Sequence, residues 1–578
     1  MHRFTRQLAL FLLLAAFALA AAAQPVITGI NKTNLPRSGR VAIVGSGFGL
    51  SGDVVIGGRS AWTTTWTDTR IVAYVPEAAG LGTAALHVAA QGQQSNTVSL
   101  TVSARQSNGR IRWSFEADGD NLRWRPALAP DGTIYLHTNN TTDGLVYALS
   151  PNGALRWIQK VNWNPYVPPS AGPDGAVYVG SIGTIYRISP AGGIDWQYNP
   201  PNGINIEVSP TIGPDGLLYG AFEVSGAFAI EPLTGEVVWS NPGDPMMTDK
   251  SGEATEMKFG PAGPNQPVDQ LYLSMDGGAG FYGFSLDGEQ LFTAGLDNIT
   301  GTAEAAIGSD GKIYGPRFIG LWIAAIDPSD GSTLWQYDPG WATGTRNVEI
   351  GPDDTLYFTG SSAYLEAFNP HAERSLWRNN AVLGLGRPSV TPDGSTLVVS
   401  GANNGQPGFV KAYATRNGRE LWSLDLPFQA SPSLRVLGTH HPRITPDSAT
   451  AYVSTVTLAE WPLNQDPHSS LYAINIDGSP DAPVDSDGDG AVDEVDNCTF
   501  VPNGQQTDTD ADGYGNACDA DFNNDLMVNG LDVGPFISQF GTAGPDADFN
   551  GDGLVNGLDI GSFVDMYGQP PGPSGQAP

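Results

Sequence analysis

The sequence repeats one pattern of short β-strands at spacings near 40 residues over most of its length. One copy, PALAPDGTIYLHTNNTTDGLVYALSPNGALRW, runs from Pro126 to Trp157. Each copy has an Asp-Gly-type turn, a second strand that usually carries a tyrosine, and a last strand that ends on an aromatic residue. The closing aromatics are Trp113, Trp157, Trp196, Trp239, Phe292, Trp335, Trp377 and Trp422. The second-strand residues are Tyr135, Tyr178, Tyr219, Tyr272, Tyr314, Tyr357, Val398 and Tyr452. A repeat of this length predicts an array of similar sheets, one for each copy.

The order of the two series predicts how the array closes. Trp113 precedes the first tyrosine, and no closing tryptophan follows Tyr452. We therefore expect residues 110–115 to supply the outer strand of the sheet that residues 433–476 begin, which leaves no open sheet edge. The repeat resembles the PQQ-like (quinoprotein-type) β-propeller over roughly two thirds of the chain. The resemblance implies an eight-bladed propeller over residues 105–480, and it leaves the function open because this scaffold carries many activities.

Composition supports a mainly β protein and restricts its partners. The 578 residues include 73 glycines and 44 prolines, and no long segment has helical periodicity. The net charge is −32, and residues 481–578 contain 19 acidic residues with no lysine or arginine. Such a chain repels nucleic acid and anionic membranes and attracts cations, so we expect no nucleic-acid partner.

The first residues have the pattern of an export signal. Arg3 and Arg6 precede the apolar run LALFLLLAAFALA, and three alanines end at Ala23. This pattern predicts a signal peptide over residues 1–23, because the run is short for a bilayer span. No later segment is apolar and long enough to cross a membrane, so we expect a secreted or cell-surface protein.

Residues 24–104 alternate short strands with turns. Pro25-Val26-Ile27, Gly45-Ser46-Gly47-Phe48-Gly49, Val75-Pro76 and Ser95-Asn96 resemble the IPT/TIG immunoglobulin-like domain. The resemblance implies a β-sandwich used as a spacer or binding module. Trp62 and Trp66 could form a sugar-stacking surface, and ordinary packing within the sandwich is the alternative that base rates favour.

The positions that the propeller repeat does not dictate are candidates for a binding surface. Alignment on the innermost strand of each copy predicts a polar column at one mouth of the central channel: Arg125, Ser209, Glu256, Glu304, Asn347, Arg387 and His441. These side chains could orient a polar ligand, and a solvated rim without a ligand is the alternative.

The sequence assigns no catalytic residue. Quinoprotein dehydrogenases usually carry a disulfide over their quinone, and residues 105–480 contain no cysteine, so we expect no PQQ catalysis. No GxSxG motif indicates a serine hydrolase. Glu256 and Glu304 are the one candidate pair of glycosidase carboxylates, but placement in adjacent sheets does not fix their separation.

Two acidic loops follow the propeller, over residues 481–519. Alternate aspartates in Gly-turned loops place several oxygens on one side, as calcium requires. The first set is Asp485, Asp487, Asp489, Asp493 and Asp496; the second is Asp508, Asp510, Asp512, Asn516 and Asp519. With Asp496-Asn497-Cys498, this stretch resembles thrombospondin type 3 repeats. Asn516 stands where that family commonly has aspartate, which weakens the second set. Cys498 and Cys518 are the only cysteines, and we expect them to form a disulfide in an exported chain.

Two further acidic loops, each followed by a short apolar helix, cover residues 520–568. DFNNDLMVNGLD starts at Asp521, and DFNGDGLVNGLD starts 27 residues later at Asp548. The candidate calcium ligands are Asp521, Asn523, Asp525, Asn529 and Asp532 in the first copy and Asp548, Asn550, Asp552, Asn556 and Asp559 in the second. The pair resembles a type I dockerin, which implies a cohesin-like partner. Residues 569–578, rich in Pro and Gly, are expected to be a disordered tail.

The sequence thus predicts an exported, modular, calcium-binding protein. The first hypothesis is a non-catalytic binding and scaffold protein whose propeller recognises a polysaccharide or a surface protein and whose dockerin-like end docks to a cohesin-like partner. The alternative is a dockerin-tethered glycoside hydrolase of polysaccharide breakdown, because dockerins most often tether such enzymes.

Overall fold

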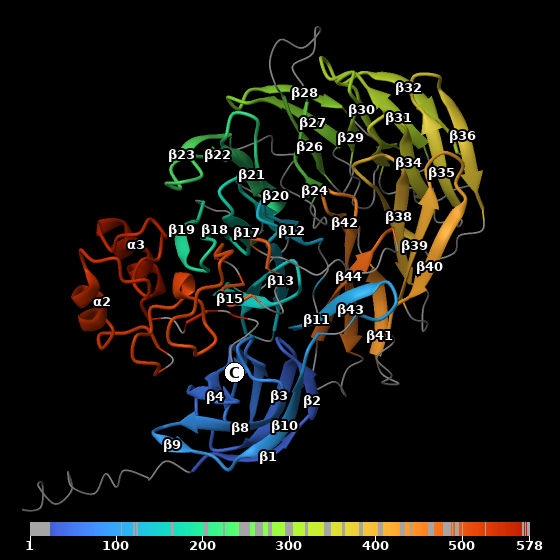
Figure 1. Ribbon diagram of the computed structural model, residues 1–578. Coiled ribbons are helices and arrows are strands. Elements are labelled where there is room, and N and C mark those ends of the chain that lie inside the picture. Colours follow the sequence, from blue (N-terminus) through green and yellow to red (C-terminus); the bar gives the residue numbers. More distant parts are fainter. Residues whose placement is uncertain are drawn as a thin grey trace, which may run out of the picture. The chain divides into compact units, whose positions relative to one another are not determined.

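The protein is mainly β, and its described residues form two compact units that divide in the sequence between residues 104 and 105 (Figure 1). The computed structural model describes residues 24–574 apart from 106, 120–121, 123–124, 141, 163–166, 201–205, 223–225, 242–254, 261–269, 276–279, 295–304, 318–321, 340–347, 361–363, 381–384, 403–407, 428–433, 440–441, 460–467, 478–486, 488, 492–495, 500, 526, 569–570 and 573. The predicted signal peptide therefore lies outside the described residues. No helix within the described ranges is long and apolar enough to cross a membrane.

Two sheets enclose the core of the first unit. One sheet pairs β1 (Val26–Ile30), β3 (Arg40–Ser46), β7 (Arg70–Tyr74) and β6 (Thr63–Trp66) in that order. The other pairs β2 (Asn34–Pro36), β10 (Val98–Ser103), β8 (Gly82–Ala90), β4 (Asp53–Ile56) and β5 (Arg59–Ser60), and β9 (Gln93–Gln94) adds to β8. Buried and accessible residues alternate along β8, as expected for a strand with one face on a core. Trp66 packs against this core, and its Nε1 donates a hydrogen bond to the Phe48 carbonyl.

Eight sheets follow in the second unit. The first four contain β12 (Ala127–Leu128), β13 (Ile134–Asn139), β14 (Gly144–Leu149) and β15 (Leu155–Val161); β16 (Ser170–Ala171), β17 (Val177–Ser181), β18 (Thr184–Ile188) and β19 (Ile194–Tyr198); β20 (Ile206–Ile212), β21 (Leu218–Phe222), β22 (Gly226–Ile230), β23 (Val237–Asn241) and β24 (Thr255–Glu256); and β25 (Lys258–Gly260), β26 (Gln270–Met275), β27 (Gly280–Ser285) and β28 (Gln290–Ala294).

The other four sheets contain β29 (Ala306–Ile307), β30 (Ile313–Arg317), β31 (Trp322–Ile326) and β32 (Thr333–Tyr337); β33 (Val348–Ile350), β34 (Leu356–Gly360), β35 (Tyr364–Asn369) and β36 (Arg374–Asn379); β37 (Leu385–Val390), β38 (Thr396–Ala402), β39 (Gly408–Ala414) and β40 (Glu420–Asp425); and β11 (Ile111–Asp118), β44 (His468–Asn475), β43 (Thr450–Ala459), β41 (Leu434–Thr439) and β42 (Arg443–Ile444). The first strands of successive sheets contact one another, for example β12 with β16 and β29 with β33, so these strands are the innermost.

The predicted closing strand is confirmed. β11 pairs antiparallel with β44, so residues from the start of the second unit complete the last sheet. β11 also contacts β13 of the first sheet, and Trp113 Nε1 donates a 2.8 Å hydrogen bond to the Pro151 carbonyl in that sheet's turn.

The tryptophan series holds neighbouring sheets together. Trp157 Nε1 donates to the Pro190 carbonyl of the next sheet at 2.7 Å, and Trp196 Nε1 donates to the Pro232 carbonyl at 2.9 Å. Each ring lies against the glycine of the turn it bonds: a Cβ at Gly192 would lie 2.8 Å from the Trp157 ring. The tryptophans therefore act in packing between sheets, because a buried indole N–H needs an acceptor and a turn glycine leaves room for the ring.

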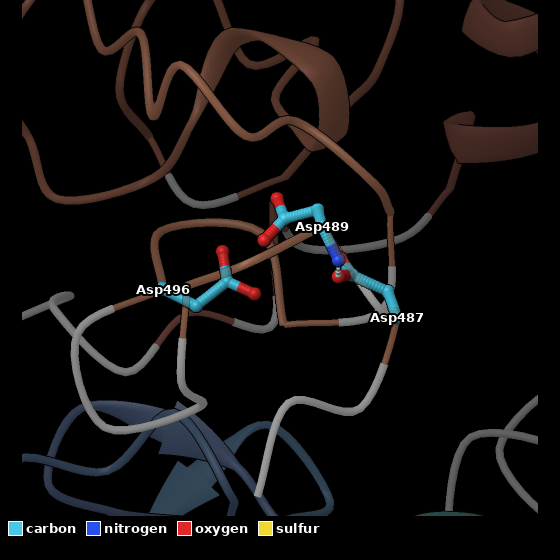
Figure 2. Close-up of side chains that lie close together, drawn as sticks. All are labelled: Asp487, Asp489 and Asp496. Atoms are coloured by element: carbon cyan, nitrogen blue, oxygen red, sulfur yellow. Dashed lines mark hydrogen bonds between the residues drawn. The ribbon is translucent and has the colours of Figure 1, made fainter. Parts of the chain in front are cut away.

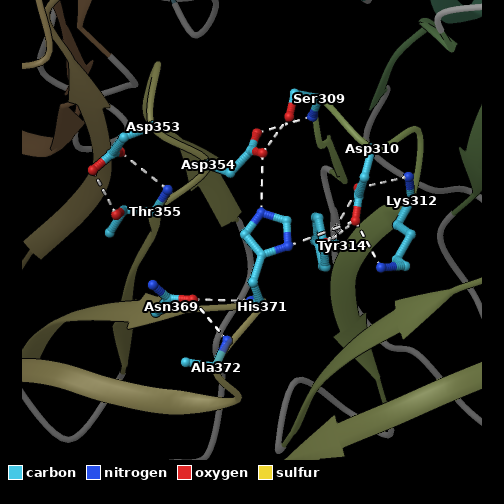
Figure 3. Close-up of polar contacts among 10 residues, drawn as sticks. All are labelled: Ser309, Asp310, Lys312, Tyr314, Asp353, Asp354, Thr355, Asn369, His371 and Ala372. Carbon is cyan, nitrogen blue, oxygen red and sulfur yellow. Dashed lines mark hydrogen bonds and ion pairs between the residues drawn. The ribbon is translucent and has the colours of Figure 1, made fainter. Parts of the chain in front are cut away.

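One inter-sheet contact combines two departures from the repeat, at Asp354 and Ser309 (Figure 3). Asp354 adopts a left-handed φ of 62° where the matching turns of five sheets have glycine. Ser309 stands where most turns have proline, and its N–H donates to Asp354 Oδ1 at 2.9 Å while its hydroxyl donates to Asp354 Oδ2. His371 Nε2 lies 3.1 Å from Asp354 Oδ2. Burial raises the pKa of Asp354, but the hydrogen bonds from Ser309 and His371 outweigh it and hold that pKa below its usual value.

The effects of Ser309→Pro and Asp354→Gly on the free energy of unfolding are expected to be non-additive. Asp354→Gly alone removes hydrogen bonds that a proline at position 309 could not make, so it should lower the free energy of unfolding by about 1–2 kcal/mol. In the Ser309→Pro background the same change should cost far less, because the lost partner is already absent and glycine favours the left-handed turn. A double-mutant cycle measured by chemical denaturation tests this, with Ser448→Gly as the control at another left-handed turn residue. Additivity within about 0.5 kcal/mol would refute the coupling.

His137 makes the packing between the first two sheets sensitive to pH. It is 2 % exposed, and its Nε2–H donates to the Val167 carbonyl at 2.7 Å. Burial lowers the pKa of His137 to about 4, although the bond to Val167 opposes this. The folded state thus holds a neutral imidazole that the unfolded chain protonates near pH 6.5.

We therefore expect the protein to lose stability as the pH falls from about 6.5 towards about 4, by roughly 3 kcal/mol in total from this group. The contribution is fully present above the unfolded pKa. His137→Gln keeps an N–H donor and does not titrate, so the difference between variant and wild type in urea midpoint should change across this range. A difference independent of pH would contradict the assignment.

Short helices and loops form the C-terminal part of the chain. They are the 3-10 turn η2 (Asn516–Cys518) and the helices α2 (Val533–Gln539) and α3 (Gly557–Met566). Phe536, Phe549 and Phe563 form a small core between the loops and helices, with the Phe536 and Phe563 rings stacked at 4.8 Å.

Of the predicted tail, the structure describes residues 571, 572 and 574, and two of them contact the second acidic loop. Gly572 N–H donates to the Cys518 carbonyl at 3.1 Å, and the Ser574 hydroxyl, on a 4 % exposed residue, donates to the Gly513 carbonyl. A Cβ at Gly572 would lie 2.6 Å from the buried Tyr514 ring, so the absence of a side chain allows this close approach.

Candidate functional site

The first acidic loop brings three predicted ligands together (Figure 2). Asp487, Asp489 and Asp496 each place one carboxylate oxygen within 4.8 Å of the others. Oxygens that bind one calcium ion at about 2.4 Å lie no more than about 5 Å apart, so this arrangement fits the ion. Asp496 is fully buried, and its Oδ1 accepts hydrogen bonds from Cys498 N–H at 2.8 Å and Gln506 Nε2 at 2.9 Å. Asp485 and Asp493 lie outside the described residues.

The second acidic loop repeats the arrangement. Asp508, Asp510 and Asp512 also place oxygens within 4.8 Å of one another. Backbone N–H groups of Ala511 and Gly513 donate to the Asp508 carboxylate at 2.7 and 3.0 Å, which orients it within the loop. Burial and the nearby charges of Asp512, Asp510 and Asp521 raise the pKa of Asp519 to about 8. The loop therefore concentrates negative charge that a divalent cation would neutralise.

Cys498 and Cys518 form the predicted disulfide, with their Cα atoms 5.7 Å apart. It links the two acidic loops. Asn516 uses its side chain in packing: its Nδ2 donates to Thr509 Oγ1 at 2.7 Å and to the Pro545 carbonyl at 2.9 Å. A carboxylate could not donate these bonds, which gives asparagine a structural reason at this position.

The third and fourth loops are near-copies of each other, and all ten predicted ligands lie in described residues. Asp532 Oδ2 accepts from Asn529 N–H at 2.8 Å in one loop, and Asp559 Oδ2 accepts from Asn556 N–H at the same distance in the other. The carboxylates of Asp521 and Asp548 accept backbone N–H groups in the same manner. Asp521, Asp532 and Asp559 are at most 1 % exposed.

The ligand residues also position the helices. Asn556 caps α3 by accepting Leu558 N–H, and the Asp559 carboxylate accepts the backbone N–H of Asn556, which completes a capping box. A carboxylate at the last position of the loop therefore serves both the helix start and the inside of the loop, where a cation would bind.

The predicted polar column at the channel mouth is described only in part. Arg125 is half-buried, and Ser209 is 2 % exposed with its hydroxyl donating to the Pro168 carbonyl at 2.7 Å. Glu256 and Arg387 lie in β24 and β37, where the structure describes their backbone only. Glu304, Asn347 and His441 lie outside the described residues. The ligand-binding role and the glycosidase alternative therefore remain predictions.

Sequence reasoning missed a second polar column, two residues further along each innermost strand. Its members are Ala127, Ser170, Thr211, Lys258, Ala306, Glu349, Ser389 and Arg443. Ser389 Oγ donates to the Pro442 carbonyl at 2.7 Å and Ser170 Oγ donates to the Pro210 carbonyl, so these two serines join neighbouring innermost strands. The other members of the column are Ala, Ser or Thr, whereas Lys258, Glu349 and Arg443 are large and charged. This difference can be seen in the sequence when the repeats are aligned.

Family models match three parts of the chain. The IPT/TIG domain matches residues 25–104, and the thrombospondin type 3 repeat matches residues 483–506 and 507–542. The model described as "Outer membrane protein assembly factor BamB", a PQQ-like model, matches residues 95–257 and 320–461. Thrombospondin type 3 repeats are calcium-binding and typical of extracellular proteins, and both three-carboxylate clusters lie in the matched residues. This set of modules fits a non-catalytic binding protein.

Among solved structures, the chain is similar to the Dos1 propeller at 12% identity and a TM-score of 0.47, covering 62% of this chain and 93% of that one. It is similar to the quinohemoprotein alcohol dehydrogenase from Comamonas testosteroni at 14% identity and a TM-score of 0.47, covering 66% and 79%. The C-terminal WD40 domain of Sif2 matches at 10% identity and a TM-score of 0.46, covering 62% and 97%. No curated protein matches the chain.

The propeller repeat is thus the largest recognised part of this protein. Its family model spans more than half of the 578 residues, in two segments separated by residues 258–319. The chain therefore belongs to the PQQ-like propeller family whose model is described as outer membrane protein assembly factor BamB.

Proposed function

We propose that this protein is an exported, calcium-stabilised scaffold, in which a non-catalytic propeller of eight blades recognises a polysaccharide or a surface protein. Its modules are a signal peptide over residues 1–23, an immunoglobulin-like IPT/TIG sandwich over 24–104, the propeller over 105–480, type 3 repeats over 481–519 and a dockerin-like pair over 520–568. The acidic loops hold calcium, and the dockerin-like pair attaches the protein to a cohesin-like partner.

The observation that carries the docking role is a set of exposed apolar side chains that repeats with the loops. Leu531 and Leu558 occupy equivalent positions 27 residues apart and are 68 % and 69 % exposed. Ile537 and Val564, also equivalent, are 62 % and 61 % exposed. Single exposed apolar residues such as Leu233 are common on soluble proteins, but a set that recurs at equivalent positions in both loop-and-helix copies supports a protein-binding surface. Gly530 and Gly557 precede the two leucines and leave the surface around them open.

Binding to a panel of immobilised cohesin domains tests the docking role. We expect the full chain to bind at least one cohesin in calcium and to lose binding in a chelator. Leu531→Asp with Leu558→Asp should weaken binding at least a hundredfold, while Leu233→Asp, a matched change at an exposed leucine of the propeller, should not. Absence of binding to every cohesin, or equal binding by the double variant, would refute the docking role.

A glycan array probed with the full chain tests recognition by the propeller. We expect binding of one class of polysaccharide without release of products, and weaker binding when Arg125 and Arg387 are both alanine. Hydrolysis of a bound glycan by the purified protein would instead establish the enzyme alternative.

A further inference from the structure

A pocket of about 250 Å³ opens among the innermost strands of three consecutive sheets. It is lined by Leu128, Ala129, Pro130, Ala171, Gly172, Pro173, Arg443, Ile444 and Pro446. These residues lie at the C-terminal ends of β12, β16 and β42 and in the turns that follow. None of the described residues of the predicted polar column lines this pocket.

Arg443 is the one charged residue of the lining, and it belongs to the second polar column, where the first two sheets have Ala127 and Ser170. Its Nε is buried and has no hydrogen-bond partner among the described residues. Burial lowers the pKa of Arg443, and the charge of Glu349 from β33 opposes this only in part. A guanidinium stays charged in proteins, and a buried N–H such as Arg443 Nε is costly without a hydrogen-bond partner, so an anion bound to Arg443 would be stabilised there.

The rest of the lining restricts the anion. Three of the nine lining residues are prolines, which have no N–H to donate. The N–H groups of Ala129 and Gly172 already donate to the Thr133 and Ala176 carbonyls, at 2.9 and 2.8 Å. The pocket therefore offers one planar donor fork in an apolar wall. A phosphate dianion normally takes several donors, whereas a carboxylate is satisfied by one guanidinium with two parallel hydrogen bonds.

The size of the pocket and the net charge of the chain also favour a small ligand with a single negative charge. The volume is below the roughly 300–1,000 Å³ of pockets for drug-sized ligands, so only a small molecule is enclosed. A chain with a net charge of −32 repels multivalent anions more than singly charged ones. We propose that this pocket binds a small monocarboxylate with an apolar body, its carboxylate on Arg443 and its body against Leu128, Ala171 and Ile444.

Benzoate and hexanoate are suitable probes, each compared with its uncharged amide by saturation-transfer NMR on the full chain. We expect both carboxylates to bind and the amides to bind at least tenfold more weakly. Arg443→Met should weaken benzoate binding at least tenfold. It should also raise the thermal midpoint of the ligand-free protein, because it removes a charged group whose Nε is buried without a hydrogen bond. Lys258→Met changes another charged member of the same column, outside the pocket, and should leave binding unchanged.

Ala171→Leu supplies a second variant that leaves Arg443 in place and fills the pocket, so it should also weaken benzoate binding at least tenfold. Equal signals from benzoate and benzamide, or unchanged benzoate binding in both variants, would overturn the proposal. Displacement of benzoate by inorganic phosphate at lower concentration than by hexanoate would also overturn it, because the site would then select for charge and not for a carboxylate on an apolar body. None of these results bears on docking through Leu531 and Leu558.

Discussion

Removal of calcium with EGTA is expected to unfold residues 487–568 and to leave the eight sheets between residues 111 and 475 folded. Residues 481–578 carry 19 acidic and no basic residues, and two clusters each crowd three carboxylates within 4.8 Å. Without a cation these charges repel one another, and the small core around Phe536 and Phe563 is too limited to compensate. Hydrogen exchange of the full chain, read by mass spectrometry, should show loss of amide protection in this segment alone.

Two controls make the experiment specific. Addition of calcium after EGTA should restore protection, whereas magnesium should not, because it dehydrates reluctantly and demands a tighter octahedral site. The disulfide between Cys498 and Cys518 should persist in EGTA, so the unfolded segment stays looped. Equal protection with and without EGTA would show that packing and the disulfide hold this segment unaided.

Replacement of Glu366 by alanine is expected to lower the free energy of unfolding by about 3–5 kcal/mol. Glu366 is fully buried in β35, where its carboxylate accepts Arg378 Nε at 3.0 Å and the Tyr337 hydroxyl at 2.7 Å. Arg378 in turn lies over the Tyr364 ring at 4.5 Å and donates to the Pro339 carbonyl. Loss of the carboxylate leaves a partly buried guanidinium without its counter-charge, and that is the costly event.

Glu420→Ala is the matched control, because Glu420 pairs with Lys411 at 3.0 Å on the exposed edge of the neighbouring sheet. Exposed ion pairs of this kind contribute about 0–1 kcal/mol. The double change Glu366→Leu with Arg378→Met should recover much of the lost stability, since apolar side chains can replace a buried pair. If urea denaturation shows similar losses in the free energy of unfolding for Glu366→Ala and Glu420→Ala, burial of the Glu366 pair does not determine its contribution.

The sequence predicted the sheets well because their signals are local and repeated. Asp-Gly turns, alternating apolar residues and the tyrosine and tryptophan series mark each copy, and even the pairing of β11 with β44 followed from the order of Trp113 and Tyr452. The acidic loops could be predicted for the same reason, because all the candidate ligands of one loop fall within twelve residues of the sequence.

The sequence could not show contacts that depend on which sheets become neighbours. The bridge from Ser309 to Asp354 joins residues 45 positions apart, and the pocket at Arg443 requires the last sheet to meet the first. The contacts of Gly572 and Ser574 with Cys518 and Gly513 also join residues that are distant in sequence. The predicted coupling between Ser309 and Asp354 and the proposed ligand site at Arg443 both depend on these contacts, which form only in the folded protein.

The number of calcium ions bound by the full chain tests the calcium-stabilised scaffold most directly. Equilibrium dialysis should count four ions per chain, one for each acidic loop. Asp552→Asn, within the fourth loop, should remove one ion, and Asp565→Asn, on the exposed side of α3, should remove none. Retention of no calcium by the wild-type chain, or an unchanged count in Asp552→Asn, would contradict the assignment of these loops.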